Sequence, residues 1–276
     1  SMNAPVNLTP DAGTDFRPHG ISLYVGPGGR ATLFVVNHPG ELLFGEQHGA
    51  DRRVLAHSVE VFDLDGMSLT HRETLAHDSM VSPNDIVAVD HERFYFTNDH
   101  GSAPGWKRTL EDYFRLGWAN VVFFDGIEFR EAAGGLSYAN GINLSPDGTR
   151  LYVAEVTHGR IREYARDIGT GELEELRRFG VGFGVDNIEV DPASGELMLG
   201  GHVKLLTFTR HATDSNVLAP SQAARVRIGD APQIETVFLD DGELISGASV
   251  ATARDEVLLI GSVFEPHFVV CEDGVR

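Results

Sequence analysis

The stretch YANGINLSPDGTRLYVAE, residues 138–155, contains the pattern that decides the fold. A polar residue and a small one precede a β-branched residue, Ser145-Pro146-Asp147-Gly148 forms a turn, and a second apolar strand follows. This unit recurs five times, at intervals of roughly 47 to 65 residues. The five openings are His19-Gly20-Ile21, Asn84-Asp85-Ile86, Asn140-Gly141-Ile142, Asp186-Asn187-Ile188 and Gly247-Ala248-Ser249-Val250.

Each repeat continues beyond its first hairpin. We expect third strands at Val59–Phe62, Val121–Phe124, Ile161–Tyr164, Leu205–Phe208 and Phe268–Cys271. More polar fourth strands, such as Glu172–Phe179 and Gln233–Phe238, complete four of the five repeats. Four antiparallel strands per repeat predict an all-β fold, a β-propeller whose first strands line a central axis. A β-sandwich would show no such repeat.

The chain of 276 residues is expected to form one propeller domain, residues 1–276. The fifth repeat lacks a fourth strand, and we expect Pro5–Thr9 to pair with its open edge. The segment Trp106–Leu116 shows helical spacing of its apolar residues. It is either an ordinary packed helix or a cover over the mouth of the axis.

Acidic residues outnumber basic ones by 41 to 22, which gives a formal net charge of −19. Such a charge repels phosphate backbones, so nucleic acid is not an expected partner. No apolar run is long enough to span a membrane. Cys271 is the only cysteine, so no disulfide within the chain is possible.

Polar side chains at the repeat openings are the strongest chemical signal. If the openings are equivalent inner strands, then Asn84, Asn140, Asp186 and Asn187 face one axis from different blades. Amide and carboxylate oxygens without sulfur suit Ca²⁺ and fit Zn²⁺ poorly. Asp85 and Asp99 could support the ion. The competing interpretation is that Asn and Asp at strand starts only cap turns.

Two histidines of the first repeat supply a candidate proton acceptor. A hairpin turning near Gly26–Gly29 places His19 and His38 close together at the same end. One imidazole could take a proton from water while the other orients it, and a bound cation could stabilise the charge developing on an ester oxygen. His100 and His202 lie at similar places in other repeats and are expected to line the same pocket. A single histidine at a strand end is often structural.

Other nucleophiles are not supported. The chain has no Gly-x-Ser-x-Gly elbow and no Gly-rich phosphate loop between a strand and a helix. Water is therefore the expected nucleophile.

The chain resembles the paraoxonases, a family of calcium-dependent lactonases and arylesterases built as six-bladed propellers. The resemblance runs from about Phe16 to Cys271. It is carried by RPHGISLYV, LFVVNHPG, VEVF, SPNDIVAVDHERFYFTNDH, YANGINLSPDGTRLYVAE, VDNIEVDPASGELMLGGH and LLIGSVF.

The resemblance assigns roles to individual residues. It implies that His19 and His38 form the catalytic dyad, with His19 as the base, and that Asp99 and His100 assist proton transfer. Tyr138 would form a pocket wall, and the side chains of Asn84, Asn140, Asp186 and Asn187 would bind a catalytic calcium. Asp85 and the carbonyl of Ile21 would bind a second, structural calcium.

Two departures from the family pattern stand out. The family's first blade, with a Glu-Asp pair that contributes to both calcium sites, is absent from this sequence, and the family disulfide partner of Cys271 lies in that blade. The segment Glu41–His57 is longer than the family's connection and is expected to reshape the pocket rim.

We therefore expect a calcium-dependent lactonase with side activities on aryl esters and organophosphates. Acyl-homoserine lactones are candidate substrates, which would make the protein a quorum-quenching enzyme. Two alternatives remain: a sugar-lactone hydrolase of the gluconolactonase type, which would not need His38, and a propeller that binds a ligand without catalysis. The resemblance favours a periplasmic or secreted location over the cytoplasm, and the oligomeric state is left open.

Overall fold

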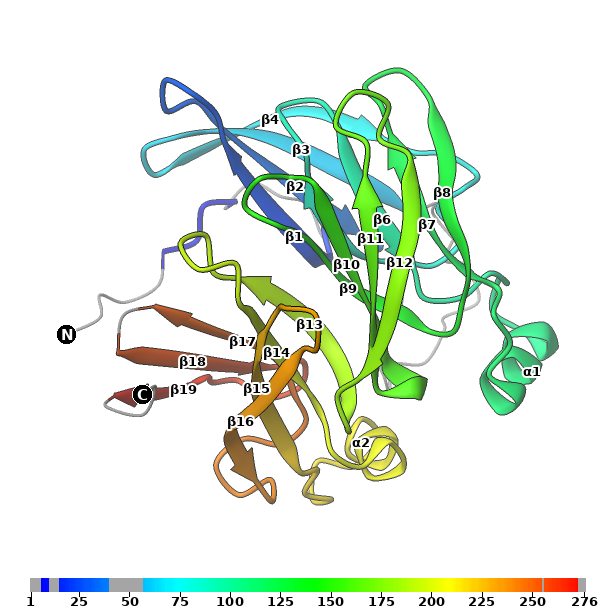
Figure 1. Cartoon of the computed structure of the whole chain (residues 1–276), viewed down its shortest axis with the longest axis vertical. Helices are drawn as coiled ribbons and strands as arrows, with labels where there is room; N and C mark the ends of the chain where they lie inside the picture. Colours follow the sequence, from blue (N-terminus) through cyan, green and yellow to red (C-terminus); the bar gives the residue numbers. More distant parts are fainter. Residues whose placement is uncertain (1–5, 10–14, 40–56, 255, 273–276) are drawn as a thin grey trace.

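A computed structural model of the protein describes residues 6–9, 15–39, 57–254 and 256–272. Five antiparallel sheets are arranged as the blades of a propeller, with their first strands toward the middle (Figure 1). The fold is all-β apart from two α-helices and one short 3-10 helix, Val156–His158. Among the described residues, no helix is long and apolar enough to cross a membrane.

The blades follow the chain in order, and each inner strand is followed by its outer neighbours. Blade 1 contains β1 (Pro18–Val25), β2 (Ala31–Asn37), β3 (Ser58–Asp65) and β4 (Ser68–Leu75). Blade 2 contains β5 (Pro83–Ala88), β6 (Phe94–Asn98), β7 (Ala119–Phe124) and β8 (Phe129–Leu136). Blade 3 contains β9 (Ala139–Leu144), β10 (Arg150–Glu155), β11 (Arg160–Arg166) and β12 (Leu173–Gly180). Blade 4 contains β13 (Gly184–Val190), β14 (Leu197–His202), β15 (Ser221–Arg227) and β16 (Gln233–Asp240), and blade 5 contains β17 (Ala248–Arg254), β18 (Val257–Ser262) and β19 (Val269–Glu272).

Apolar side chains on the sheet faces join neighbouring blades. Four buried clusters lie in turn between blades 1 and 2, 2 and 3, 3 and 4, and 4 and 5. Tyr95 illustrates the packing, because its ring stacks on Phe123 with 4.3 Å between centroids and its hydroxyl donates to Gly171 O of the next blade at 2.7 Å. The alternation of strand residues between two faces makes this arrangement possible.

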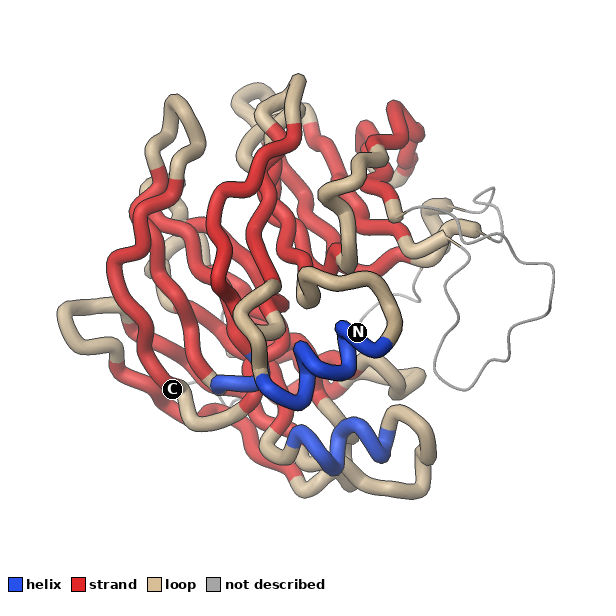
Figure 2. The backbone as a smooth tube through the Cα atoms, turned by 90° about the vertical axis from the view of Figure 1, so that its right-hand side faces the viewer, coloured by secondary structure: helices blue, strands red, loops and turns tan. Residues whose placement is uncertain are grey.

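The predicted helix and a second one lie at the same end of the blades (Figure 2). The first, α1 (Trp106–Phe114), follows β6, and the second, α2 (Leu205–His211), follows β14. Our prediction of a third strand at Leu205–Phe208 is wrong, because this segment is α2 and the third strand of blade 4 is β15.

The described part of the chain bears on two expectations about closure of the ring. Residues 6–9 form no strand, so the predicted pairing of Pro5–Thr9 is wrong for these four residues, and Pro5 lies outside the described residues. The described residues form five blades and no sixth. The outer face of β1 remains exposed at Ile21, Leu23 and Val25.

Candidate active site

The predicted site residues lie where the inner strands depart from regular pairing. In blade 1 the register of β1 against β2 shifts between the pairs Pro18–Asn37 and Ile21–Val35. Equivalent shifts occur in blades 2, 3 and 4. A β-bulge of this kind inserts an extra residue and re-aims the side chains beside it. The bulged pairs are His19-Gly20, Asn84-Asp85, Asn140-Gly141 and Asp186-Asn187.

The openings of blades 1 to 3 are in direct contact. A Cβ atom on Gly20 would lie 2.5 Å from the carbonyl oxygen of Asn84, so only glycine permits this approach. The Oδ2 atom of Asp85 accepts the backbone N–H of Ile142 at 2.9 Å. The Oγ1 of Thr97 donates to the carbonyl of Asn140 at 2.7 Å. Thr97 was not singled out from the sequence, although it is buried and bridges two blades.

The contacts continue around the axis to blade 5. A Cβ atom on Gly141 would lie 2.6 Å from the carbonyl oxygen of Asp186 and 2.7 Å from Cα of Asn187. The side-chain Nδ2 of Asn187 donates to the carbonyl of Ser249 at 3.2 Å. Neighbouring openings are therefore in contact from blade 1 to blade 5, and the four predicted calcium ligands belong to the openings of blades 2, 3 and 4.

The donor set of this ring fits a hard cation. The Oδ1 atom of Asn140 is buried and has no hydrogen-bond partner among the described residues, which is costly for an amide oxygen unless a ligand satisfies it. No group of three His, Cys, Asp or Glu side chains in the described ranges could hold a metal ion. Three of the four predicted ligands are amides, so oxygen donors from Asn and Asp are what the ring offers.

Asp85 carries a carboxyl group whose ionisation is disfavoured. Desolvation raises its pKa to about 7, although the backbone N–H groups of Ile142 and Ile86 donate to it. The negative charges of Glu189 and Asp186 contribute to the same rise in pKa. Ile21, whose carbonyl is the other predicted ligand of a second ion, follows Gly20, which contacts Asp85.

A second group of site residues lies at the end of blade 2. The Nδ1 of His100 lies 2.7 Å from Oδ1 of Asp99, and Nδ2 of Asn84 donates to Oδ2 of Asp99 at 3.4 Å. Burial raises the pKa of Asp99, but the hydrogen bond and charge of His100, with smaller contributions from Ser82 and Arg108, together hold that pKa below its ordinary value. The His100 ring meets the Tyr138 ring edge-on, with 5.0 Å between centroids. Tyr138 adopts a left-handed backbone (φ 54°), which is uncommon for a residue other than glycine and occurs at functional sites.

Blade 4 contributes an acid–imidazole pair. The Nε2 of His202 lies 3.2 Å from Oδ2 of Asp186, and its Nδ1 is buried without a hydrogen-bond partner. The His202 ring stacks on Phe208 of α2, with 3.5 Å between centroids. Phe208 of α2 therefore packs against the acid–imidazole pair.

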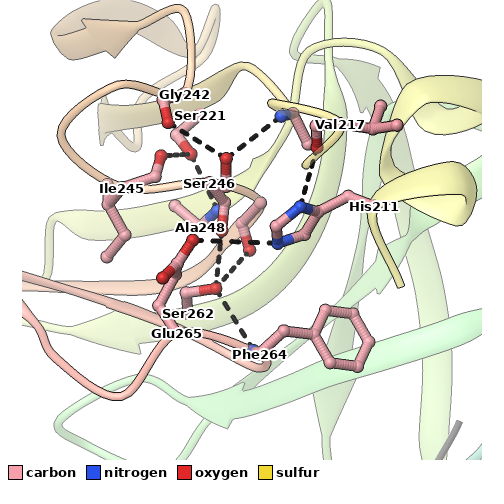
Figure 3. Close-up of polar contacts among 12 residues, drawn as sticks. His211, Val217, Ser221, Gly242, Ile245, Ser246, Ala248, Ser262, Phe264 and Glu265 are labelled. Atoms are coloured by element: carbon pink, nitrogen blue, oxygen red, sulfur yellow. Dashed lines mark hydrogen bonds and ion pairs between the residues drawn. The ribbon is translucent and has the colours of Figure 1, made fainter. Parts of the chain in front are cut away.

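The far end of α2 is anchored to its own loop and to blade 5 (Figure 3). The Nδ1 of His211 donates to Val217 O at 2.8 Å, and its Nε2 lies 3.8 Å from Oε1 of Glu265.

The first residue of β15 connects blade 4 to blade 5. The Oγ of Ser221 donates to Ile245 O at 2.6 Å and accepts the N–H of Ala248 at 2.9 Å, which fixes the start of β17.

The two histidines of blade 1 come together. The rings of His19 and His38 meet edge to face, with 5.0 Å between centroids and an interplanar angle of 79°. A third histidine, His57, contacts His38 on its other side, with 4.7 Å between centroids. His57 directly precedes β3 just as His38 directly follows β2, but the long connection between the two strands leaves their pairing undetectable from the sequence. Residues 41–56 of that segment lie outside the described residues.

The last residue of the second strand holds the start of the inner strand in three blades. In blade 1, Oδ1 of Asn37 accepts the N–H of Arg17 at 2.6 Å. In blade 2, Oδ1 of Asn98 accepts the N–H of Ser82 at 2.9 Å. Glu155 does the same in blade 3 for the N–H of Ser137 at 2.9 Å. When the blades are aligned by their strand pairing, Asp99 of blade 2 and His202 of blade 4 occupy the position equivalent to His38 of blade 1. His100 lies one residue beyond that position.

We expect Asn98→Ala to lower the free energy of unfolding by about 2–4 kcal/mol, measured by urea denaturation. Asn98 is fully buried, and its Nδ2 also donates to Ser79 O and Asn120 Oδ1, each at 2.8 Å. Its removal leaves buried polar groups without partners. The exposed Asn216→Ala is the matched control and should change stability by less than about 0.5 kcal/mol. Equal effects of the two substitutions would contradict this role for Asn98.

Two hollows lie near the blade 2 and blade 3 openings. A small one is lined by Asp99, His100, Tyr138 and Thr157 together with Glu111 and Arg115 at the α1 end. A larger, open one of about 550 Å³ is lined by residues 101–107 and Trp118. Trp106, Tyr113 and Phe114 of α1 are exposed, so α1 stands beside the site with apolar side chains in solvent.

Comparisons with known proteins agree with the expected family. A sequence model of the arylesterase family matches residues 8–272. Serum paraoxonase/arylesterase 2 of Rattus norvegicus is 34% identical over 264 residues, which cover 93% of this chain and 69% of the relative. Serum paraoxonase/arylesterase 1 of Homo sapiens is 34% identical over 255 residues, which cover 91% of this chain and 67% of the relative.

Solved structures share the fold at low sequence identity. A putative 6-phosphogluconolactonase from Bacteroides uniformis superposes with a TM-score of 0.54 at 12% identity, over 92% of this chain and 82% of that one. A luciferin-regenerating enzyme gives a TM-score of 0.51 at 12% identity, over 90% of this chain and 71% of that one. The chain therefore belongs to the arylesterase family, together with the serum paraoxonases, and is a hydrolase of the esterase and lactonase kind.

Proposed function

We propose that the protein is a calcium-dependent lactonase that uses water as its nucleophile and the His19–His38 pair to activate it. The observation that carries the proposal is the meeting of Asn84, Asn140 and Asp186 at one axis, with Oδ1 of Asn140 left without a partner. A ring of oxygen donors fits Ca²⁺, and the neighbouring blade supplies imidazoles that titrate near neutral pH.

The chain's own residues have separate roles in this mechanism. His19 accepts the proton of the attacking water, and His38, packed edge to face against it, stabilises the resulting imidazolium. The side chains of Asn84, Asn140, Asp186 and Asn187 would hold the calcium. When bound, calcium supplies a positive charge that stabilises the oxygen on which negative charge develops. Phe208 and Tyr138 flank His202 and His100 and limit the access of solvent water.

The open hollow of about 550 Å³ is bordered by Trp106 and Trp118, which offer apolar surface to an acyl chain. We therefore propose acyl lactones, including acyl-homoserine lactones, with aryl esters and organophosphates as side substrates. A gluconolactonase type of activity is the second candidate, and it would not require His38.

A substrate panel tests this proposal. Acyl-homoserine lactones, δ-gluconolactone, phenyl acetate and paraoxon are incubated with the protein, with calcium and with a chelator. We expect calcium-dependent turnover that is fastest with the acyl lactones. Preference for δ-gluconolactone, with turnover retained in His38→Gln, would favour the sugar-lactone function. No turnover under any condition would favour a ligand-binding propeller.

The pKa of Asp85 predicts how calcium acts on stability. Its folded pKa of about 7 lies above the ordinary value of 3.8, so folding favours the protonated form. In metal-free protein this contribution is present at low pH and is lost as pH rises toward 7, by up to about 4 kcal/mol. We propose that a second calcium bound by Asp85 and the Ile21 carbonyl offsets the loss.

We expect the melting temperature in chelator to fall between pH 5.5 and pH 8, and calcium to raise it most at pH 8. Asp85→Asn is the matched variant: its melting temperature should depend less on pH in chelator and respond less to calcium. If the melting temperatures of the wild type and Asp85→Asn depend equally on pH in chelator, the prediction is contradicted. The other acidic residues would then cause the pH dependence.

We also propose that the ring is of the six-bladed type. Five blades are joined by four apolar clusters, and Ile21, Leu23 and Val25 on the outer face of β1 are 62%, 51% and 59% exposed. A further blade would cover this face. The described residues leave this face of β1 exposed, so we expect the dye ANS to bind to it. Leu23→Lys should then weaken the fluorescence of the bound dye. Unchanged fluorescence would mean that the dye binds elsewhere.

A further inference from the structure

Three histidines stand side by side at the ends of adjacent strands of blade 1. Asn37, the last residue of β2, pairs with Pro18 on one side and with Ser58 on the other. His38 and His57 are therefore the next facing positions beyond the β2–β3 ladder. Facing residues of an antiparallel pair present their side chains on the same face, only about 5 Å apart. The register thus brings their rings together.

A hydrogen bond joins the two rings through the same atom of each. The Nδ1 of His38 lies 2.9 Å from Nδ1 of His57. One Nδ1 must donate and the other must accept, so a neutral acceptor ring carries its proton on Nε2. If both rings were fully protonated, two N–H groups would face each other. The bond therefore requires complementary tautomers in the neutral pair: the donor ring carries its proton on Nδ1 and the acceptor ring carries its proton on Nε2.

The backbone around His38 is already fixed. Its N–H donates to Arg17 O at 3.1 Å, and the preceding Asn37 accepts the N–H of Arg17 at 2.6 Å. The remaining freedom of His38 is the rotation and the tautomer of its ring. His19 contacts one side of this ring and His57 hydrogen-bonds to it, so His57 sets how the His38 ring meets His19.

We propose that His57 is a positioning residue of the hydrolytic site, which acts through His38 by holding its imidazole in one orientation and one tautomer. The inference rests on the proposed function of the His19–His38 pair and extends it to a third histidine. Partners that orient a functional histidine in this way commonly contribute 10–100-fold to the function of the histidine they hold, about 1.4–2.7 kcal/mol.

Two substitutions separate hydrogen bonding from packing. His57→Phe keeps an aromatic ring against His38 but cannot form the hydrogen bond. His57→Asn lacks the ring but places an amide near the position of Nδ1. His77→Phe, at an exposed histidine in the connection between β4 and β5, is the control for the replacement of histidine by phenylalanine. Circular dichroism and melting curves confirm that each variant is folded.

With whichever lactone or ester the wild type hydrolyses, we expect His57→Phe to lower kcat about 10–100-fold with little change in KM. His57→Asn should recover most of the lost kcat, and His77→Phe should leave it unchanged. Full activity of His57→Phe, or equal losses in His57→Phe and His57→Asn, would overturn the proposal.

A second measurement does not depend on turnover. Long-range proton–nitrogen NMR spectra of protein labelled with ¹⁵N-histidine report the tautomer of each ring, and the His38 signals are assigned with His38→Gln. We expect one His38 tautomer in the wild type and in His57→Asn, and a mixture in His57→Phe. Identical spectra in all three would overturn the inference. If the wild type cleaves no substrate of the panel, the proposed function fails while this test still decides the role of His57.

Discussion

Replacement of His19 by glutamine is expected to lower kcat about 10²–10⁴-fold, the usual contribution of a general base. Glutamine keeps a polar side chain of similar length but cannot accept a proton at neutral pH. The His19 ring is exposed and lies in the bulge of β1, so the substitution should change KM and the melting temperature little. Steady-state kinetics with the best substrate of the panel measures the effect.

The matched control is the exposed His77→Gln, which changes the same chemical group away from the axis. Its kcat should equal that of the wild type. If His19→Gln retains more than about a tenth of the wild-type kcat, His19 is not the base, and the Asp99–His100 pair becomes the next candidate because its 2.7 Å hydrogen bond would orient His100 for the same task.

The repeat predicted most of the fold because each blade carries its own local signals. The turn Ser145–Gly148 and the alternation in β9 and β10 are decided within one hairpin. Buried residues between blades, such as Phe34 and Phe94, belong to apolar strands. These strands pack against a neighbouring blade without needing a specific partner residue. Blade-level structure is therefore local enough to be predicted from a single sequence.

The failed predictions depend on contacts between distant segments. Leu205–Phe208 was predicted as a strand because apolar residues occupy it, but Phe208 stacks on His202 and the segment folds as a helix. The pairing of His57 with His38 depends on the register of β2 with β3, which are separated by a long connection. Tertiary packing determines these features, and they cannot be predicted from the periodicity of a short segment.

The neighbouring positions of the repeat openings could be predicted for a different reason. Asn84, Asn140 and Asp186 occupy the same place in successive repeats, and a repeated phase places side chains around a common axis whatever the details of packing. The bulges that re-aim them were not predicted, since a bulge is visible only once two strands are paired. The sequence repeat therefore predicts which residues occupy equivalent positions in the blades. The pairing of the strands decides the direction of their side chains.

Asp186→Asn is expected to weaken calcium binding at least about 100-fold and to abolish most of the lactonase activity at moderate calcium. Asp186 is buried and is the only carboxylate among the four predicted ligands of the catalytic ion, and calcium affinity depends strongly on ligand charge. Asparagine keeps the shape and removes the charge. Calorimetric titration with calcium, together with kcat/KM at rising calcium, measures the effect.

The control removes one negative charge from the surface through Glu174→Gln, an exposed position of β12. It should bind calcium as the wild type does. Recovery of Asp186→Asn activity at high calcium would show that the carboxylate acts through the ion. Lost activity with unchanged calcium affinity would contradict the metal role and would instead indicate that Asp186 acts through His202, whose Nε2 lies 3.2 Å from its carboxylate.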